Sequence, residues 1–71
     1  MQLSDGKIGD SLRVLSMNLP ANMEKRLEAL GMTIGSEITI LNSKSDGVLI
    51  VKIRGTRFAL GRNLTKNVEV R

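Results

Sequence analysis

The amino-acid sequence predicts a mainly β protein, a small closed or half-closed barrel of about five strands with one inserted α-helix. One observation is the change of apolar period within residues 19–40, from every third or fourth residue to every second residue. Another is a series of short alternating segments, separated by glycine-containing turns, over the rest of the chain. A flat five-stranded sheet would also expose an apolar face that one short helix covers only in part, so closure into a barrel is favoured.

The helix is expected between Pro20 and Leu30. Proline suits the first turn of a helix, and either Asn18 or Asn22 is placed to cap its N-terminus. Gly31 follows the last apolar position, where a helix C-terminus favours a residue with positive φ. The apolar stripe of the helix consists of Leu19, Met23, Leu27 and Leu30. We therefore expect a short amphipathic helix that lies between the first two strands and closes one end of the barrel.

Five segments alternate between polar and apolar side chains, as half-buried strands do. These segments are residues 11–15, 37–40, 48–53, 57–60 and 67–70. Tight turns are expected at Asp46-Gly47 and Arg54-Gly55, and residues 61–66 are expected to form a loop. The expected core comprises Leu12, Val14, Leu27, Leu30, Ile38, Ile40, Leu49, Val51, Ile53, Phe58, Leu60, Val68 and Val70.

The length and composition indicate one small domain, residues 1–71, with a small core. Because the sequence has no cysteine, neither a disulfide nor a thiolate metal site can stabilise that core. No apolar run approaches the roughly 20 residues that span a bilayer. Residues 1–5 lack the basic and apolar regions of a signal peptide. These features predict a cytoplasmic protein.

The net charge of +4 is unevenly distributed along the chain. Residues 52–71 carry six bases and one acid, whereas residues 1–51 carry five bases and six acids. Such a basic segment is either the solvated outer face of strands or a surface for nucleic acid, an anionic membrane or an acidic partner. Phe58 is the only aromatic residue and is expected to be buried, so it offers no platform for stacked bases. A nucleic-acid-binding barrel therefore stays an alternative, but nucleic acid is not the partner that we expect.

The residue types argue against an enzyme. The chain contains no His, Cys, Tyr or Trp, so it lacks the usual general base near neutral pH and the strongest nucleophile. Zinc and ferrous sites rely on imidazole or thiolate ligands, and we expect no bound metal or other cofactor. Glu24 and Glu28 lie four residues apart and could hold a cation weakly, which leaves a weak metal-binding carrier as another alternative. A solvated helix surface explains these two carboxylates more simply.

The segment 26–38 carries a distinctive combination of residues. They are Arg26, Leu27, Leu30, Gly31, Met32, Gly35 and Ile38. This combination resembles the signature of the FeoA family of small ferrous-iron transport proteins, which reads roughly R-L-x-x-L-G-[LM]-x-x-G-x-x-[VI]. Agreement extends outward to Leu3 and Gly9, Asp46-Gly47, Ile53-x-Gly55-x-x-Phe58-Ala59-Leu60 and Val68-x-Val70. Because nearly every matching residue is apolar or glycine, the motif indicates a fold rather than an active site.

The resemblance implies an SH3-like barrel with an inserted helix, in agreement with the pattern of strands and turns. It also implies a non-enzymatic cytosolic accessory that binds FeoB, the membrane ferrous-iron transporter with a G-protein domain, and reaches the membrane only through it. No small-molecule substrate is implied, any transition-metal binding would be weak, and weak homo-oligomerisation is left open. The same module forms the C-terminal domain of DtxR-type repressors. Because the sequence begins at Met1 and ends with the barrel, the transport accessory is favoured.

The resemblance supplies no catalytic or metal-binding residue. If the protein docks on a partner, the exposed features available are the helix, the turn 32–34 and the hairpin 42–47. We predict the helix side, with Arg26 and Met32 as the candidate partner-binding residues. Two alternatives stay open: Arg26 lies over the barrel and donates to loop carbonyls, or Met32 packs in the core.

Overall fold

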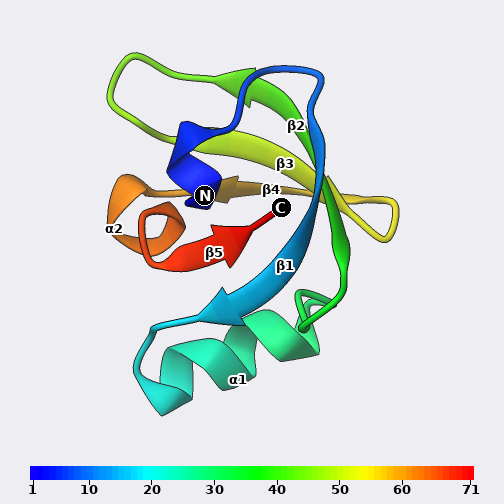
Figure 1. The fold of residues 1–71 in the computed structure, drawn as a ribbon, viewed down its shortest axis with the longest axis vertical. Coiled ribbons are helices and arrows are strands. Elements are labelled where there is room, and N and C mark those ends of the chain that lie inside the picture. The colour runs from blue at the N-terminus through cyan, green and yellow to red at the C-terminus, as the bar shows by residue number, and fades with distance from the viewer.

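The computed structural model describes residues 1–71, which form five strands and three short helices. The strands are β1 (Ser11–Met17), β2 (Glu37–Ser43), β3 (Leu49–Ile53), β4 (Thr56–Leu60) and β5 (Val68–Val70). The helices are the 3-10 helix η1 (Leu3–Asp5), the inserted helix α1 (Ala21–Ala29) and the four-residue helix α2 (Arg62–Thr65). Figure 1 shows the strands curving around a common centre, with α1 beyond the end of β1. None of the three helices has the length and apolar character that spanning a bilayer requires.

The five strands form one antiparallel sheet in the order β4-β3-β2-β1-β5. β1 pairs with β2 through its first residues, Ser11 to Arg13, and with β5 from Val14 onward. The two strands at the ends of this order, β4 and β5, do not pair with each other. The sheet is therefore a half-closed barrel with an open seam, and the predicted five-stranded, mainly β architecture is confirmed.

The core lies inside the curve of the sheet. Twelve apolar side chains form it: Leu3, Val14, Leu27, Met32, Ile38, Ile40, Leu49, Val51, Ile53, Leu60, Val68 and Val70. The alternation expected for strands is visible in β3, where the first, third and fifth residues are buried. Three residues expected in the core are not fully buried. Leu12 and Phe58 are only half-buried, and Leu30 is 49% exposed.

Two local predictions are wrong. Neither Asn18 nor Asn22 caps α1, because Pro20 occupies the N-cap position and no side chain accepts from the first turn. Residues 61–66 do not form an irregular loop but contain α2, whose Thr65 N–H donates to Gly61 O at 3.0 Å. A single helical turn is too short to produce a periodic apolar pattern. Its buried residue, Thr65, is polar and therefore does not contribute to such a pattern.

The β3–β4 connection is the tight turn that the sequence predicts. Ile53 and Thr56 are paired, so the turn consists of Arg54 and Gly55 alone. Both residues have positive φ, 50° and 82°, which is the geometry of a type I′ turn. Glycine adopts this conformation readily, but for arginine it is uncommon.

Candidate partner-binding surface

The C-terminus of α1 is closed by a hydrogen-bonding pattern that requires Gly31. Its φ is 100°, its N–H donates to Glu28 O at 2.9 Å, and the next N–H, of Met32, donates to Leu27 O at 2.9 Å. These two bonds define a Schellman motif and satisfy carbonyl groups that the helix end would otherwise leave free. The predicted glycine stop is therefore confirmed.

The same motif decides where Met32 points. A Schellman motif brings the residue after the glycine against the last turn of the helix. Here Met32 is fully buried and Leu27 is 6% exposed, and both belong to the core. The expectation that the turn exposes Met32 is wrong, and packing in the core is the correct alternative. Met32 has no exposed surface with which to contact a partner, so the docking prediction is narrowed to Arg26.

Hydrogen bonds hold the segment between Gly31 and Ser36 in one conformation. The Ser36 hydroxyl donates to Gly31 O at 3.0 Å and accepts from the N–H of Thr33 at 3.0 Å. Backbone bonds between Val14 and the residues at the end of this segment tie it to β1. Ile34 stands at the tip of the segment with 59% of its surface exposed.

One face of α1 remains uncovered. Met23, Arg26 and Leu30 lie at positions i, i+3 and i+7, which share a side of a helix. Met23 is 38% exposed and Leu30 is 49% exposed, whereas Leu27 is the only buried residue within the helix. Together with Ile34, these three residues are called the α1 surface below.

The Arg26 side chain is exposed and makes no hydrogen bond or ion pair with the rest of the chain. The structure therefore does not support the alternative in which this side chain donates to loop carbonyls. The guanidinium is free to pair with a carboxylate of another molecule, on the side of the helix that also carries Met23 and Leu30.

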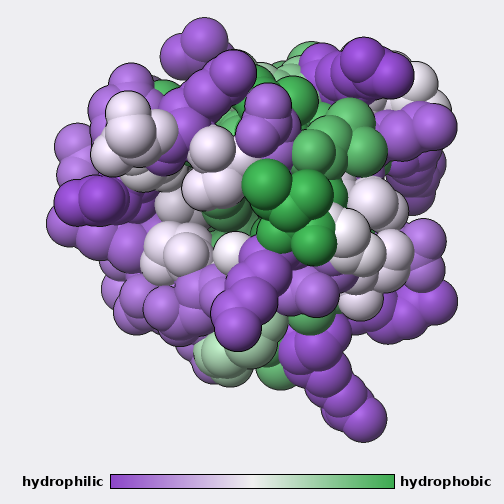
Figure 2. Space-filling view, turned by 90° about the horizontal axis from the view of Figure 1, so that it is seen from above, coloured by the Kyte–Doolittle hydropathy of each residue, from purple (hydrophilic) through white to green (hydrophobic).

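A second region of exposed apolar surface lies at the other end of the molecule. Figure 2 shows hydrophobic atoms in the middle of this face, surrounded by hydrophilic ones. Ile8, in the loop before β1, is 61% exposed. The α1 surface differs in that two of its exposed apolar residues, Met23 and Leu30, share one side of a single helix.

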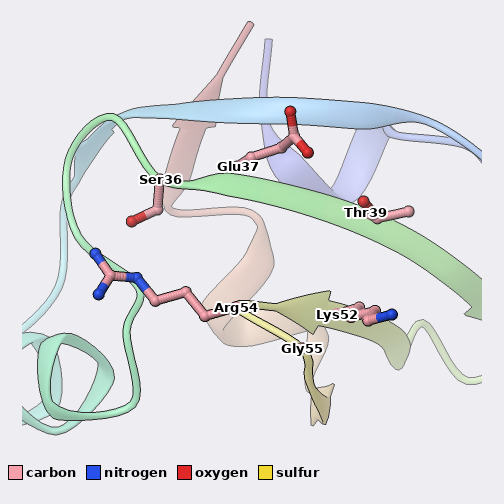
Figure 3. A pocket seen from close by; sticks show the side chains of 6 residues that line it. All are labelled: Ser36, Glu37, Thr39, Lys52, Arg54 and Gly55. Atoms are coloured by element: carbon pink, nitrogen blue, oxygen red, sulfur yellow. The ribbon is translucent and has the colours of Figure 1, made fainter.

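A polar pocket lies between β2 and the β3–β4 turn. Its lining residues are Ser36, Glu37, Thr39, Lys52, Arg54 and Gly55. Figure 3 shows Arg54 extended toward the loop that carries Ser36. A Cβ on Gly31 would lie 3.0 Å from Cδ of Arg54, so the arginine stem runs close over the glycine stop.

This pocket offers little for catalysis or for a metal. Glu37 is its only carboxylate, and the two cations beside it do not form a nucleophile–base pair. No three residues of the types His, Cys, Asp or Glu come together in a geometry that could hold a metal ion. Glu24 and Glu28 on α1 are likewise not joined by a third ligand.

The half-closed barrel and its inserted helix define the class of the protein, an SH3-like domain. Residues 1–71 match the family model of the FeoA domain, and the chain therefore belongs to the FeoA family, which is linked to ferrous iron transport. The fold and the family that the sequence motif indicates are both confirmed. No curated protein sequence gives a significant match.

Solved FeoA structures resemble this one over almost its whole length. FeoA from Chlorobium tepidum superposes with a TM-score of 0.91 at 28% identity, over 99% of this chain and 68% of that chain. An iron uptake regulatory protein (FeoA) superposes with a TM-score of 0.85 at 34% identity, over 99% and 92%. Stenotrophomonas maltophilia FeoA, solved with zinc, superposes at 0.83 with 34% identity, over 100% and 89%. That protein is described as a procaryotic SH3 domain protein and a candidate ferrous iron transport activating factor.

The fold also occurs within metal-dependent repressors. A manganese-dependent transcriptional repressor superposes with a TM-score of 0.85 at 20% identity, over 96% of this chain and 39% of that chain. At this identity the likeness concerns the fold alone.

Proposed function

We propose that this protein is a non-enzymatic, cytoplasmic accessory of ferrous iron uptake that binds the cytosolic part of a FeoB-type transporter through the α1 surface. The observation that carries the proposal is the exposure of this surface. Within nine residues of helix only Leu27 is buried, while Met23, Leu30 and the neighbouring Ile34 are 38–59% exposed. Contact with a partner would remove this apolar area from water, which is the main driving force of association.

The α1 surface is also held rigidly. The Schellman motif fixes the end of the helix, and the Ser36 hydrogen bonds fix the segment that carries Ile34. A surface that is ordered before binding loses less conformational entropy when the complex forms. The free energy of binding therefore does not have to offset the entropic cost of ordering a flexible loop.

The composition supports a binding role rather than a catalytic one. A chain without His, Cys, Tyr or Trp has few groups that can transfer protons or attack a substrate near neutral pH. The polar pocket adds one carboxylate and two cations, which suit ion pairing. The family's link to ferrous iron transport then points to regulation or assembly of the transporter.

The proposal is tested by calorimetric titration of the protein with the cytosolic part of the FeoB-type transporter from the same organism, with and without guanine nucleotide. Arg26→Glu and Leu30→Asp are each expected to weaken binding at least tenfold without changing the melting temperature. Lys44→Glu, in the exposed β2–β3 hairpin, is the matched control and is expected to bind like the wild type. Wild-type affinity in both α1 variants, or no binding by the wild type, would contradict the proposal.

A further inference from the structure

β4 is an edge of the sheet, and the backbone groups of two of its five residues have no partner. It pairs only with β3, and the two-residue turn makes Ile53 and Thr56 a hydrogen-bonded pair. Because hydrogen-bonded and non-hydrogen-bonded pairs alternate along an antiparallel ladder, Arg57 and Ala59 are the residues whose N–H and C=O point away from β3. No turn or loop hydrogen bond uses these groups.

The opposite edge of the sheet is already covered. Gln2 forms a bridge with Glu69 of β5, and the N–H of Val70 donates to Met1 O at 2.7 Å. The first residues of the chain thus occupy the free side of β5. β4 alone keeps an open edge, which is a template for another strand.

The outer face of the β3–β4 hairpin carries three unpaired bases. Lys52 lies directly opposite Arg57 in the register. Arg54, in the turn that follows β3, lines the same pocket as Lys52. Like charges in directly opposite positions destabilise a sheet. No carboxylate lies within 4.0 Å of these bases, because the only ion pair in the chain joins the terminal amine to Glu69. Glu37 lies in the same pocket as Lys52 and Arg54 but forms no ion pair with either, so the repulsion between Lys52 and Arg57 is not relieved by a direct contact.

Phe58 is the third unusual feature of this edge. Its side chain packs against the core from the inner side of β4, yet it remains only half-buried. β4 is the last strand at this end of the sheet, so no strand beyond it contributes a side chain that could cover the ring. A further strand along β4 would bring a side chain over this ring and bury it.

We infer from this juxtaposition that β4 binds an extended acidic segment of a partner protein as a sixth strand. The segment's backbone would pair with the N–H and C=O groups of Arg57 and Ala59. Its outward carboxylates would neutralise Arg57 and Lys52, and an inward apolar side chain would cover Phe58. A membrane or a nucleic acid would use the charge alone, whereas an extended peptide satisfies the charge, the open backbone groups and the aromatic ring together.

This interaction uses a surface separate from the α1 surface and goes beyond the proposed transporter contact. The probe is an acetylated and amidated peptide of alternating Glu and Val, which presents carboxylates on one side and apolar side chains on the other. It is added to ¹⁵N-labelled protein, and amide hydrogen exchange is followed by NMR. At saturation we expect the exchange of the Arg57 and Ala59 amides to slow at least tenfold.

Two control peptides and a series of protein concentrations test the mode of binding. A peptide of alternating Lys and Val is expected to give no protection, because its charge is wrong. The Glu-Val peptide with N-methyl groups at alternate residues, on the edge that would face β4, is also expected to give none, because it cannot form the ladder. Protection that rises with protein concentration alone would mean that a second copy occupies the edge and would overturn the inference.

Substitutions in the protein itself test the same edge. Lys52→Glu combined with Arg57→Glu is expected to weaken peptide binding at least tenfold. Ala59→Pro removes an outward N–H without breaking a bond to β3, and is expected to abolish protection at Arg57. If Ala59→Pro lowers the melting temperature, the N-methylated and unmodified peptides are compared on wild-type protein. That comparison decides whether binding requires backbone pairing with β4.

Variants on α1 provide the matched control. Lys25→Glu and Arg26→Glu are expected to leave peptide binding unchanged. Loss of peptide binding at the β4 edge can therefore be distinguished from loss of transporter binding at the α1 surface. Equal binding of the N-methylated peptide, or equal protection of these amides by an oligonucleotide or by phosphatidylglycerol vesicles, would overturn the inference in favour of a general polyanion surface.

Discussion

The central strands and the inserted helix bury their apolar residues very differently. In β2 and β3, the inward side chains of Ile38, Ile40 and Val51 are fully buried. In α1, Leu27 alone is buried, whereas Met23 and Leu30 of its apolar stripe keep a large exposed fraction. The sheet therefore provides most of the stability, whereas the helix presents a surface that the sheet supports.

Geometry accounts for this difference. Alternation directs every second side chain of a strand to the inside of a curved sheet, so each strand buries several residues at once. α1 lies beyond the end of β1 and meets the core at one position (Figure 1). The chain then fills the remaining space with Met32 from the turn after the helix.

The largest effect is expected from truncation in the central strands. Ile40→Ala removes a fully buried side chain from β2 and should lower the free energy of unfolding by about 2–5 kcal/mol. Urea denaturation monitored by circular dichroism measures this loss. If Ile40→Ala lowers the free energy of unfolding no more than a truncation on α1 does, the claim that the sheet provides most of the stability is incorrect.

An intermediate effect is expected at the junction between helix and sheet. Gly31→Ala places a side chain at φ 100° and should cost about 1–2 kcal/mol. In a domain of this size each kcal/mol lowers the melting temperature by roughly 4–8 °C. Gly61→Ala is the matched control, because Gly61 has a φ of −72° and open space around its Cβ position, and should change stability by less than about 0.5 kcal/mol. Equal losses in the two variants would contradict the assigned Schellman motif.

The smallest effect on stability is expected on the α1 surface itself. Met23→Ala and Leu30→Ala truncate exposed side chains and introduce a better helix former, so each should change the free energy of unfolding by less than about 0.5 kcal/mol. The same urea titrations provide the comparison with Ile40→Ala. A loss above about 2 kcal/mol in either variant would show that α1 belongs to the core.

The sequence predicts the strands and the helix stop well, because both depend on local patterns. Alternation identifies Leu49, Val51 and Ile53 as one buried side, and Gly31 marks the only place where the helix can end with positive φ. The barrel and its family likewise follow from the spacing of glycine and apolar residues.

The errors arise where long-range packing decides. Leu30 and Met32 are both apolar and lie two residues apart, and only the direction that the chain takes after Gly31 determines which of them is buried. Leu3 and Thr65 enter the core from a 3-10 helix and a single helical turn, neither of which has a periodic pattern. The open edge of β4 is also invisible in the sequence, because it depends on which strands remain unpaired in the assembled sheet.

The two-residue turn between β3 and β4 also has a consequence for the order in which the molecule folds. This hairpin closes almost no loop, whereas the pairing of Val14 with Val70 joins positions more than fifty residues apart. Since the entropic cost of loop closure grows as about (3/2)RT ln n, the β1–β5 contact costs roughly 2–3 kcal/mol more to initiate. We therefore expect β2, β3 and β4 to form the folding nucleus, with β1 and β5 joining late. Pulsed hydrogen exchange should then protect the Val51 amide before the Arg71 amide, which donates to Arg13 O of β1. The reverse order would place the nucleus at the chain ends.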